Sequence, residues 1–141
     1  MTSEKNQNPI LSGFENDPYT AAFPELRTFW EATARGQFLV KTCRQCERAH
    51  WYPRMFCPHC SSPDTEWRAS TGEGHIYAFS EVLRTEVPYV LAYVRLVEGP
   101  IVMTNIVDCD PDQLQIDQPV RVLFRPAQEG RSFPVFTPVQ R

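Results

Sequence analysis

The spacing of apolar positions changes along the chain, from a helical period near the N-terminus to short β-type runs in the C-terminal half. Within Pro24–Arg35, the apolar residues Leu26, Phe29 and Trp30 recur at offsets of three and four residues, which places their side chains on one face of a helix. A proline suits the first helical turn, and Gly36 follows the last periodic residue, where glycine commonly ends a helix. The pattern therefore predicts one helix over residues 24–35 with a single apolar face.

Residues 1–22 are mostly polar and show neither period. Prolines and a glycine interrupt them, so we expect an extended arm with little structure of its own. The arm is either a plain tail or a segment that docks on a partner. Docking would use the few apolar side chains of the arm, which are Ile10, Leu11, Phe14 and Tyr19.

Short runs of β-branched and aromatic residues, separated by turn signals, dominate the chain after Trp67. Such runs are typical of strands. Gly72 and Gly74 stand at the start of the first run, where glycine permits a sharp coil or a bulge. One strand is predicted before the first cysteine pair, at residues 37–42, and five follow at residues 75–83, 89–97, 101–107, 120–124 and 133–139.

The composition agrees with a mainly β protein. The 141 residues include 13 prolines, 6 glycines and 9 phenylalanines, which favours short strands and rigid turns over a bundle of long helices. Five curved strands with few helical runs between them predict a small OB-type barrel, closed or partly open. We therefore divide the chain into an arm (residues 1–22), a helix with a metal-binding module (23–68) and an OB-fold domain (69–141).

Two pairs of cysteines carry the clearest chemical signal. Two residues separate the members of each pair, and ten residues separate the pairs, which are Cys43 with Cys46 and Cys57 with Cys60. This spacing lets four thiolates complete a tetrahedral zinc site with Zn–S distances of about 2.3 Å. Iron is the chemical alternative, because soft thiolates suit both metals, and a metal-free fold is a third possibility. We expect a structural zinc ion, since four protein ligands leave no open position.

No residue pattern in the chain indicates catalysis. His50 and His59 lie near the cysteine pairs, but four thiolates already complete a site. Cys109 is flanked by Asp108 and Asp110, whose charges oppose the thiolate that a nucleophile needs. The sequence has no spacing of nucleophile, base and acid, and no phosphate-binding glycine loop. We predict no catalytic residue in this chain.

Charge is unevenly distributed. The total of −3 opposes a broad nucleic-acid surface, but residues 27–68 hold seven basic side chains against four acidic ones. These charges are either scattered over solvated loops or gathered around a local anion such as a nucleotide phosphate. Arg54 is the first candidate for a phosphate contact, because it stands between an aromatic pair and the second cysteine pair.

The sequence also bears on the compartment. No apolar run approaches the roughly 18 residues that span a bilayer, and the N-terminal MTSEKNQNPI lacks the order of a signal peptide. Cysteines in two tight pairs suit metal binding in a reducing compartment. We expect a soluble cytoplasmic protein.

Four segments taken together resemble the family known as domain of unknown function 35: FWEATARGQFLVKTCRQC, WYPRMFCPHC, TGEGHIYAFSEV and QPVRVLF. The resemblance covers about residues 24–138 and implies an N-terminal helix, a rubredoxin-like zinc ribbon and an OB fold. It implies zinc ligation by the four paired cysteines, and it matches Trp51–Arg54 to the aromatic and basic part of the ribbon. It also implies association with thiolase-like or hydratase enzymes that act on acyl-coenzyme A.

From this resemblance we expect a non-catalytic accessory subunit of a thiolase-type acyl-CoA enzyme, which supports assembly and acyl-CoA binding in a hetero-oligomer. The thiolase-fold partner would supply the nucleophilic cysteine and the acid–base histidine. Arg54 would then contact the phosphates of the coenzyme A ester. An acyl-CoA hydratase or aldolase is the alternative partner. A nucleic-acid-binding module is the alternative function, since OB folds and zinc ribbons also serve that use.

Overall fold

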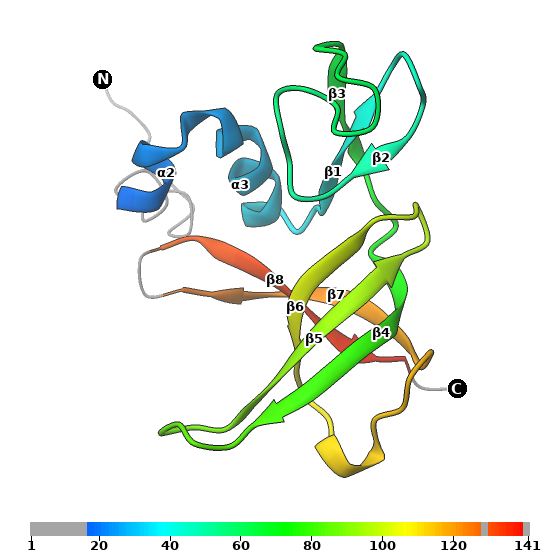
Figure 1. Cartoon of the computed structure of the whole chain (residues 1–141). Coiled ribbons are helices and arrows are strands. Elements are labelled where there is room, and N and C mark those ends of the chain that lie inside the picture. Colours follow the sequence, from blue (N-terminus) through cyan, green and yellow to red (C-terminus); the bar gives the residue numbers. More distant parts are fainter. Residues whose placement is uncertain (1–16, 128–129, 140–141) are drawn as a thin grey trace.

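A small three-stranded sheet, a five-stranded barrel and a group of short helices make up the fold in the computed structural model (Figure 1). The structure describes residues 17–127 and 130–139. Most of the arm predicted at residues 1–22, with Ile10, Leu11 and Phe14, therefore lies outside the described residues. The small sheet and the helices lie side by side above one end of the barrel in Figure 1.

The last part of the predicted arm is helical rather than extended. Asp17 caps the helix α2 (Pro18–Ala22), because its carboxylate accepts hydrogen bonds from the backbone N–H groups of Tyr19 (2.7 Å) and Thr20 (3.4 Å). An aspartate followed by a proline is a common helix start, but a helix of 5 residues is too short for an apolar period to show. The prediction of an extended segment is wrong for these residues.

The helix predicted at residues 24–35 is confirmed. It begins as the 3-10 turn η1 (Pro24–Leu26), continues as α3 (Arg27–Ala34) and is followed by Gly36 with a φ of 79°. Its apolar face is buried, with Phe29 3% and Trp30 8% exposed. None of the helices in the described ranges is long and apolar enough to cross a membrane.

Phe29 is the centre of an aromatic cluster that joins the helices to both sheets. Its ring centroid lies 4.9 Å from that of Trp30, 5.4 Å from that of Trp51 and 6.0 Å from that of Phe38. Phe38 in turn meets Phe136 of the barrel at 6.1 Å. Aromatic pairs at such distances contribute about 0.5–1.5 kcal/mol each beyond their burial. One cluster therefore holds the helices, the small sheet and the barrel together.

The small sheet places β1 (Leu39–Cys43) between β2 (Ala49–His50) and β3 (Thr65–Ala69), and both neighbours are antiparallel to it. β1 corresponds to the strand predicted at residues 37–42 and ends on the first cysteine. β3 extends one residue past the domain boundary that we predict at residue 68, and that boundary stays a prediction.

Five strands close the barrel in the order β4-β5-β6-β8-β7. Neighbouring strands are antiparallel except β6 and β8, which are parallel. The predicted OB barrel is confirmed, and each strand end lies at most two residues from its predicted position. The elements are β4 (Glu73–Val82), β5 (Tyr89–Leu96), β6 (Ile101–Ile106), the 3-10 turn η2 (Pro111–Gln113), β7 (Pro119–Pro126) and β8 (Ser132–Pro138).

Two glycines let the chain enter the barrel between its neighbours. Gly72 has a φ of 78°, and a Cβ there would lie 2.4 Å from Cγ1 of Val122. A Cβ on Gly74 would lie 2.4 Å from the backbone carbonyl oxygen of Arg95. Both positions need the absence of a side chain because backbone and core atoms approach this closely.

An ion pair between distant residues fastens α2 to the loop before β8. Nε of Arg131 lies 2.5 Å from Oδ2 of Asp17, whose side chain is fully buried. The Arg131 guanidinium also covers the rings of Tyr19 (4.5 Å) and Trp30 (5.0 Å). Burial raises the pKa of Asp17, but hydrogen bonds from Arg131 and from the backbone outweigh this and leave the pKa below its usual value.

Candidate metal centre and the adjoining groove

Two matching turns position the cysteines. The N–H of Cys43 donates to the carbonyl of Arg48 (3.0 Å), and the N–H of Cys57 donates to the carbonyl of Ser62 (2.8 Å). In each turn the residue after the second cysteine is left-handed, with a φ of 63° at Glu47 and 67° at Ser61. This backbone reversal directs both sulfurs of a pair toward the same point.

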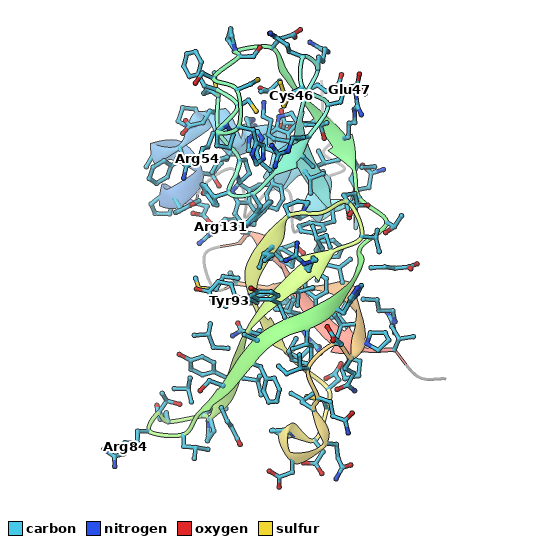
Figure 2. The ribbon with its side chains drawn as sticks, turned by 45° about the vertical axis from the view of Figure 1, so that its right-hand side comes forward. Cys46, Glu47, Arg54, Arg84, Tyr93 and Arg131 are labelled. Atoms are coloured by element: carbon cyan, nitrogen blue, oxygen red, sulfur yellow. The ribbon has the colours of Figure 1, made fainter. Side chains whose placement is uncertain are left out.

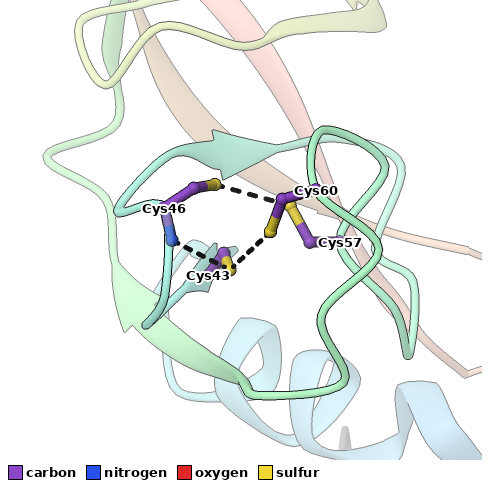
Figure 3. A group of neighbouring side chains, drawn as sticks. All are labelled: Cys43, Cys46, Cys57 and Cys60. Carbon is purple, nitrogen blue, oxygen red and sulfur yellow. Dashed lines mark hydrogen bonds between the residues drawn. The ribbon is translucent and has the colours of Figure 1, made fainter.

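The four sulfur atoms lie within 4.8 Å of one another (Figure 3). The Sγ atoms of Cys43 and Cys60 are 3.6 Å apart, and those of Cys46 and Cys57 are 3.7 Å apart. A tetrahedron with Zn–S bonds of about 2.3 Å has sulfur–sulfur edges of about 3.8 Å. The cysteines predicted as ligands are therefore brought together with the spacing that one zinc ion requires.

Electrostatics within the cluster also favour a cation. A backbone N–H from Cys46 is the main cause that lowers the pKa of Cys43 to about 7, against the effect of burial. At Cys60 a backbone hydrogen bond from Ser62 lowers the pKa, but burial and the neighbouring sulfurs outweigh it and raise the pKa to about 12. Four thiolates this close repel one another, and a positive ion between them would offset that repulsion.

The two nearby histidines lie outside this cluster of possible ligands. His50 is buried, its Nε2 accepts a hydrogen bond from the backbone N–H of Arg54 (3.4 Å), and burial lowers its pKa. His59 is exposed, and its backbone N–H donates to Sγ of Cys57 (3.3 Å). His50 thus fixes the backbone that leads into the second turn, and the backbone of His59 forms part of that turn.

The left-handed residue of the second turn gives a test of this geometry. Ser61→Gly should raise the free energy of unfolding by about 0.5 kcal/mol, because relief of left-handed strain exceeds the entropy that glycine adds to the unfolded chain. Ser61→Val should lower it by about 1 kcal/mol, since a β-branched residue resists a positive φ. Urea unfolding of both variants checks the signs, and an equal effect of the two would contradict the geometry.

A groove of about 660 Å³ runs between the metal turns and the top of the barrel. Arg48 and Arg54 line it from the ribbon side, and Arg95 lines it from β5. No ion pair involves Arg48 or Arg54 within the described ranges. Two acidic residues, Glu47 and Glu98, line it as well, and the Glu98 carboxylate accepts hydrogen bonds from Ser70 Oγ (2.8 Å) and the N–H of Thr71 (2.9 Å). Because the three arginines outnumber the two carboxylates, the groove suits an anion.

Sequence reasoning missed Arg95, which the fold brings to the same groove as Arg54. Arg54 lies in the loop after β2 and Arg95 in the barrel strand β5, and no local motif links them. The guanidinium of Arg95 lies 5.3 Å from the ring centroid of Tyr77 and donates to the carbonyl of Gly99 (3.3 Å). The sequence marks Arg95 only by its position, one residue before the end of a strand in which buried and exposed residues alternate.

Cys109 lies apart from the metal centre, in the loop after β6. It is half-buried, and burial, followed by the charges of Asp110 and Asp108, raises its pKa. A raised pKa disfavours the thiolate that a nucleophile needs, and the absence of a catalytic role for Cys109 stays a prediction.

Comparison with known proteins gives the family. The family model described as "ChsH2, rubredoxin-like zinc ribbon domain" matches residues 30–66, and that described as "ChsH2, C-terminal OB-fold domain" matches residues 67–125. A solved structure described as "Ltp2-ChsH2(DUF35) aldolase" is 30% identical, with a TM-score of 0.73 over 80% of this chain and 93% of that chain.

Two curated relatives extend the comparison. A "DUF35 domain-containing scaffold protein" of Methanothermobacter thermautotrophicus is 32% identical over 74% of this chain and 84% of its own length. A "Probable enoyl-CoA hydratase alpha subunit" of Thermomonospora curvata is 33% identical over 78% of this chain, which spans only 36% of that relative's length. With its zinc ribbon, its OB barrel and these relatives, the chain belongs to the DUF35 family of scaffold proteins.

Proposed function

We propose that this chain is a non-catalytic, zinc-binding accessory subunit of an enzyme that acts on acyl-CoA, and that it supports assembly and acyl-CoA binding. The observation that carries the proposal is the pairing of a four-cysteine centre with an arginine-lined groove where ribbon meets barrel. Four sulfur ligands suit a structural ion rather than a catalytic one. The arginines that line the groove beside it suit the phosphates of coenzyme A.

Three classes of enzyme are candidates for the partner of this subunit: a thiolase-fold protein, an aldolase and a hydratase. The sequence leads us to expect a thiolase-fold subunit, and that partner stays a prediction. The names of the relatives favour the alternative, because one is described as an aldolase with a DUF35 chain and another as a hydratase subunit. Both alternatives share the chemistry of acyl-CoA, so the subunit would serve the same purpose in each.

Co-purification distinguishes these partners. The tagged full chain, expressed in its native host, should recover an untagged enzyme subunit, which mass spectrometry would assign as a thiolase-fold protein, an aldolase or a hydratase. The complex should turn over acyl-CoA, and the purified chain alone should not. Turnover by the chain alone would overturn the non-catalytic role, and a fully active partner without this chain would overturn the accessory role.

The same experiment can test whether the N-terminal arm docks on the partner. Because Asp17 belongs to the buried ion pair with Arg131, a truncation that tests docking by the arm must end at residue 16. Deletion of residues 1–16 should weaken assembly while the thermal midpoint of the isolated chain stays unchanged. Deletion of residues 1–22 would remove α2 as well and confuse the two effects.

Arg54 is the residue that we propose for the coenzyme A phosphates. Its backbone N–H donates a hydrogen bond to Nε2 of the buried His50. Its side chain is exposed and has no ion pair in the described part of the chain. Arg48 and Arg95 line the same groove, so a phosphate there would meet several guanidinium groups. Charge-assisted hydrogen bonds of this kind contribute about 1.5–3 kcal/mol each.

Arg54→Ala should therefore weaken acyl-CoA binding by the assembled complex about tenfold or more, as measured by calorimetry. Arg35→Ala is the matched control, because Arg35 is also exposed and lies in the same basic segment but outside the groove. Unchanged affinity in Arg54→Ala, with the zinc content and thermal midpoint intact, would remove Arg54 from the site.

A further inference from the structure

The outward side of the barrel strand β5 is unusually apolar. Alternate residues of the strand point into the barrel, so that Val90 and Val94 are at most 3% exposed. The other residues of the strand point outward, and they include Tyr89 and Tyr93, each 45% exposed. An antiparallel sheet that faces water usually carries polar residues on that side. The outward side is therefore not an ordinary solvent face.

The apolar surface continues onto both neighbouring strands. Tyr93 lies opposite Met103 of β6, which is 60% exposed, and opposite Ala78 of β4. A β-bulge between Ile76 and Ala78 inserts Tyr77 there, and Tyr77 is 54% exposed. Tyr77 follows the buried Ile76 and points outward by alternation, and the bulge brings Ala78 to the same side.

The surface also extends beyond the hairpin end of β5 and borders a cavity beside β6. The β4–β5 hairpin projects beyond the barrel (Figure 1) and presents Leu83 (62% exposed) and Val87 (76% exposed). Beside the middle of β5, Met103 lines a mostly apolar cavity of about 260 Å³, together with Trp51 and Tyr52. Figure 2 shows Tyr93 between Arg131, which lines that cavity, and Arg84 at the hairpin tip.

We call this surface the strand face and define it by six side chains: Tyr77, Leu83, Val87, Tyr89, Tyr93 and Met103. Given their exposed fractions of 45% to 76%, they present on the order of 700 Å² of accessible surface. This approaches the roughly 800 Å² that each partner contributes to a standard protein interface. Exposed apolar surface of this extent commonly marks an interaction site.

We propose that the strand face is the docking surface for the catalytic enzyme subunit, an inference that rests on the proposed accessory function. The enzyme subunit would cover the aromatic strip and insert one apolar side chain into the cavity beside Met103. Position favours this occupant over a second copy of the chain. Arg95 lines the anion groove and also stacks on Tyr77, so a subunit docked here would have its surface beside the proposed phosphate site.

The test compares two methionines of equal exposure. Met103 lies on the strand face and is 60% exposed, whereas Met55 lies in the ribbon and is 59% exposed. Met103→Asp should weaken binding of the enzyme subunit recovered by co-purification about 10- to 100-fold, because it buries a carboxylate in an apolar contact. Met55→Asp should change the dissociation constant less than threefold. Tyr93→Ala should weaken binding of the enzyme subunit by a similar factor to Met103→Asp.

Each outcome has a distinct meaning. A retained zinc ion and an unchanged thermal midpoint show that a variant is folded. If the enzyme subunit binds the wild-type chain and Met103→Asp equally, or if Met55→Asp loses as much affinity, the strand face is not the docking surface and the accessory function still stands. If the isolated chain is a dimer that Met103→Asp dissociates, a second copy occupies the face. Failure to recover any enzyme subunit overturns the accessory function together with this inference.

Discussion

Cys43→Ser should give insoluble protein, and removal of the metal by a chelator should unfold the ribbon. Cys43 is fully buried at the end of β1, and its sulfur accepts N–H groups from Gln45 (3.3 Å) and Cys46 (3.4 Å). The three strands of the ribbon sheet are short, and one has only 2 residues, so the metal must supply much of the folding energy of the ribbon. Structural zinc contributes about 10–16 kcal/mol in small zinc modules, which exceeds the net stability of many domains.

Cys109→Ser is the control for this prediction, because Cys109 is a half-buried thiol that lies outside the four-sulfur cluster. That variant should stay soluble and retain one zinc ion per chain by elemental analysis. Near-ultraviolet circular dichroism should report the loss of aromatic packing on chelation, since Trp51 and Trp67 pack on Phe29. Protein purified without chelator and free of stoichiometric metal would contradict a structural metal centre.

Arg131→Ala should lower the free energy of unfolding by about 3 kcal/mol, because it leaves the buried carboxylate of Asp17 without its cation. Urea unfolding measures this difference. Arg125→Ala is the matched control, since Arg125 pairs with Asp108 at 2.6 Å but both side chains are exposed. An exposed pair of this kind contributes about 0–1 kcal/mol. Equal losses in the two variants would mean that the buried pair adds nothing beyond a surface ion pair.

The same ion pair predicts a pH dependence. The folded protein holds the pKa of Asp17 below its usual value, so the unfolded chain binds the proton more readily. The stabilisation is complete above the unfolded pKa of about 3.9 and is lost as the pH falls through the lower folded pKa. When the pH of the wild-type protein is lowered, part of the decrease in its free energy of unfolding should therefore come from protonation of Asp17. Asp17→Asn should remove that part of the dependence, and an unchanged acid profile would contradict the assignment.

The sequence by itself determined the features that depend on neighbouring residues. Two residues between paired cysteines are enough to aim both sulfurs at one point, so the metal cluster followed from spacing alone. The alternation of β5 likewise reports its buried side directly. Local signals were weaker for α2, where a capping aspartate and a proline were present but the helix was too short to show a period.

Only the tertiary structure decided which distant residues meet. Asp17 and Arg131 are 114 residues apart, and nothing near either one signals the other. Arg95 reaches the groove of Arg54 because the aromatic cluster around Phe29 seats the ribbon on the barrel. Ala78 lies opposite Tyr93 because a bulge after Ile76 shifts the register of β4 against β5. Spacing sets local direction, but contacts between elements depend on how their buried surfaces pack, which no short stretch of sequence records.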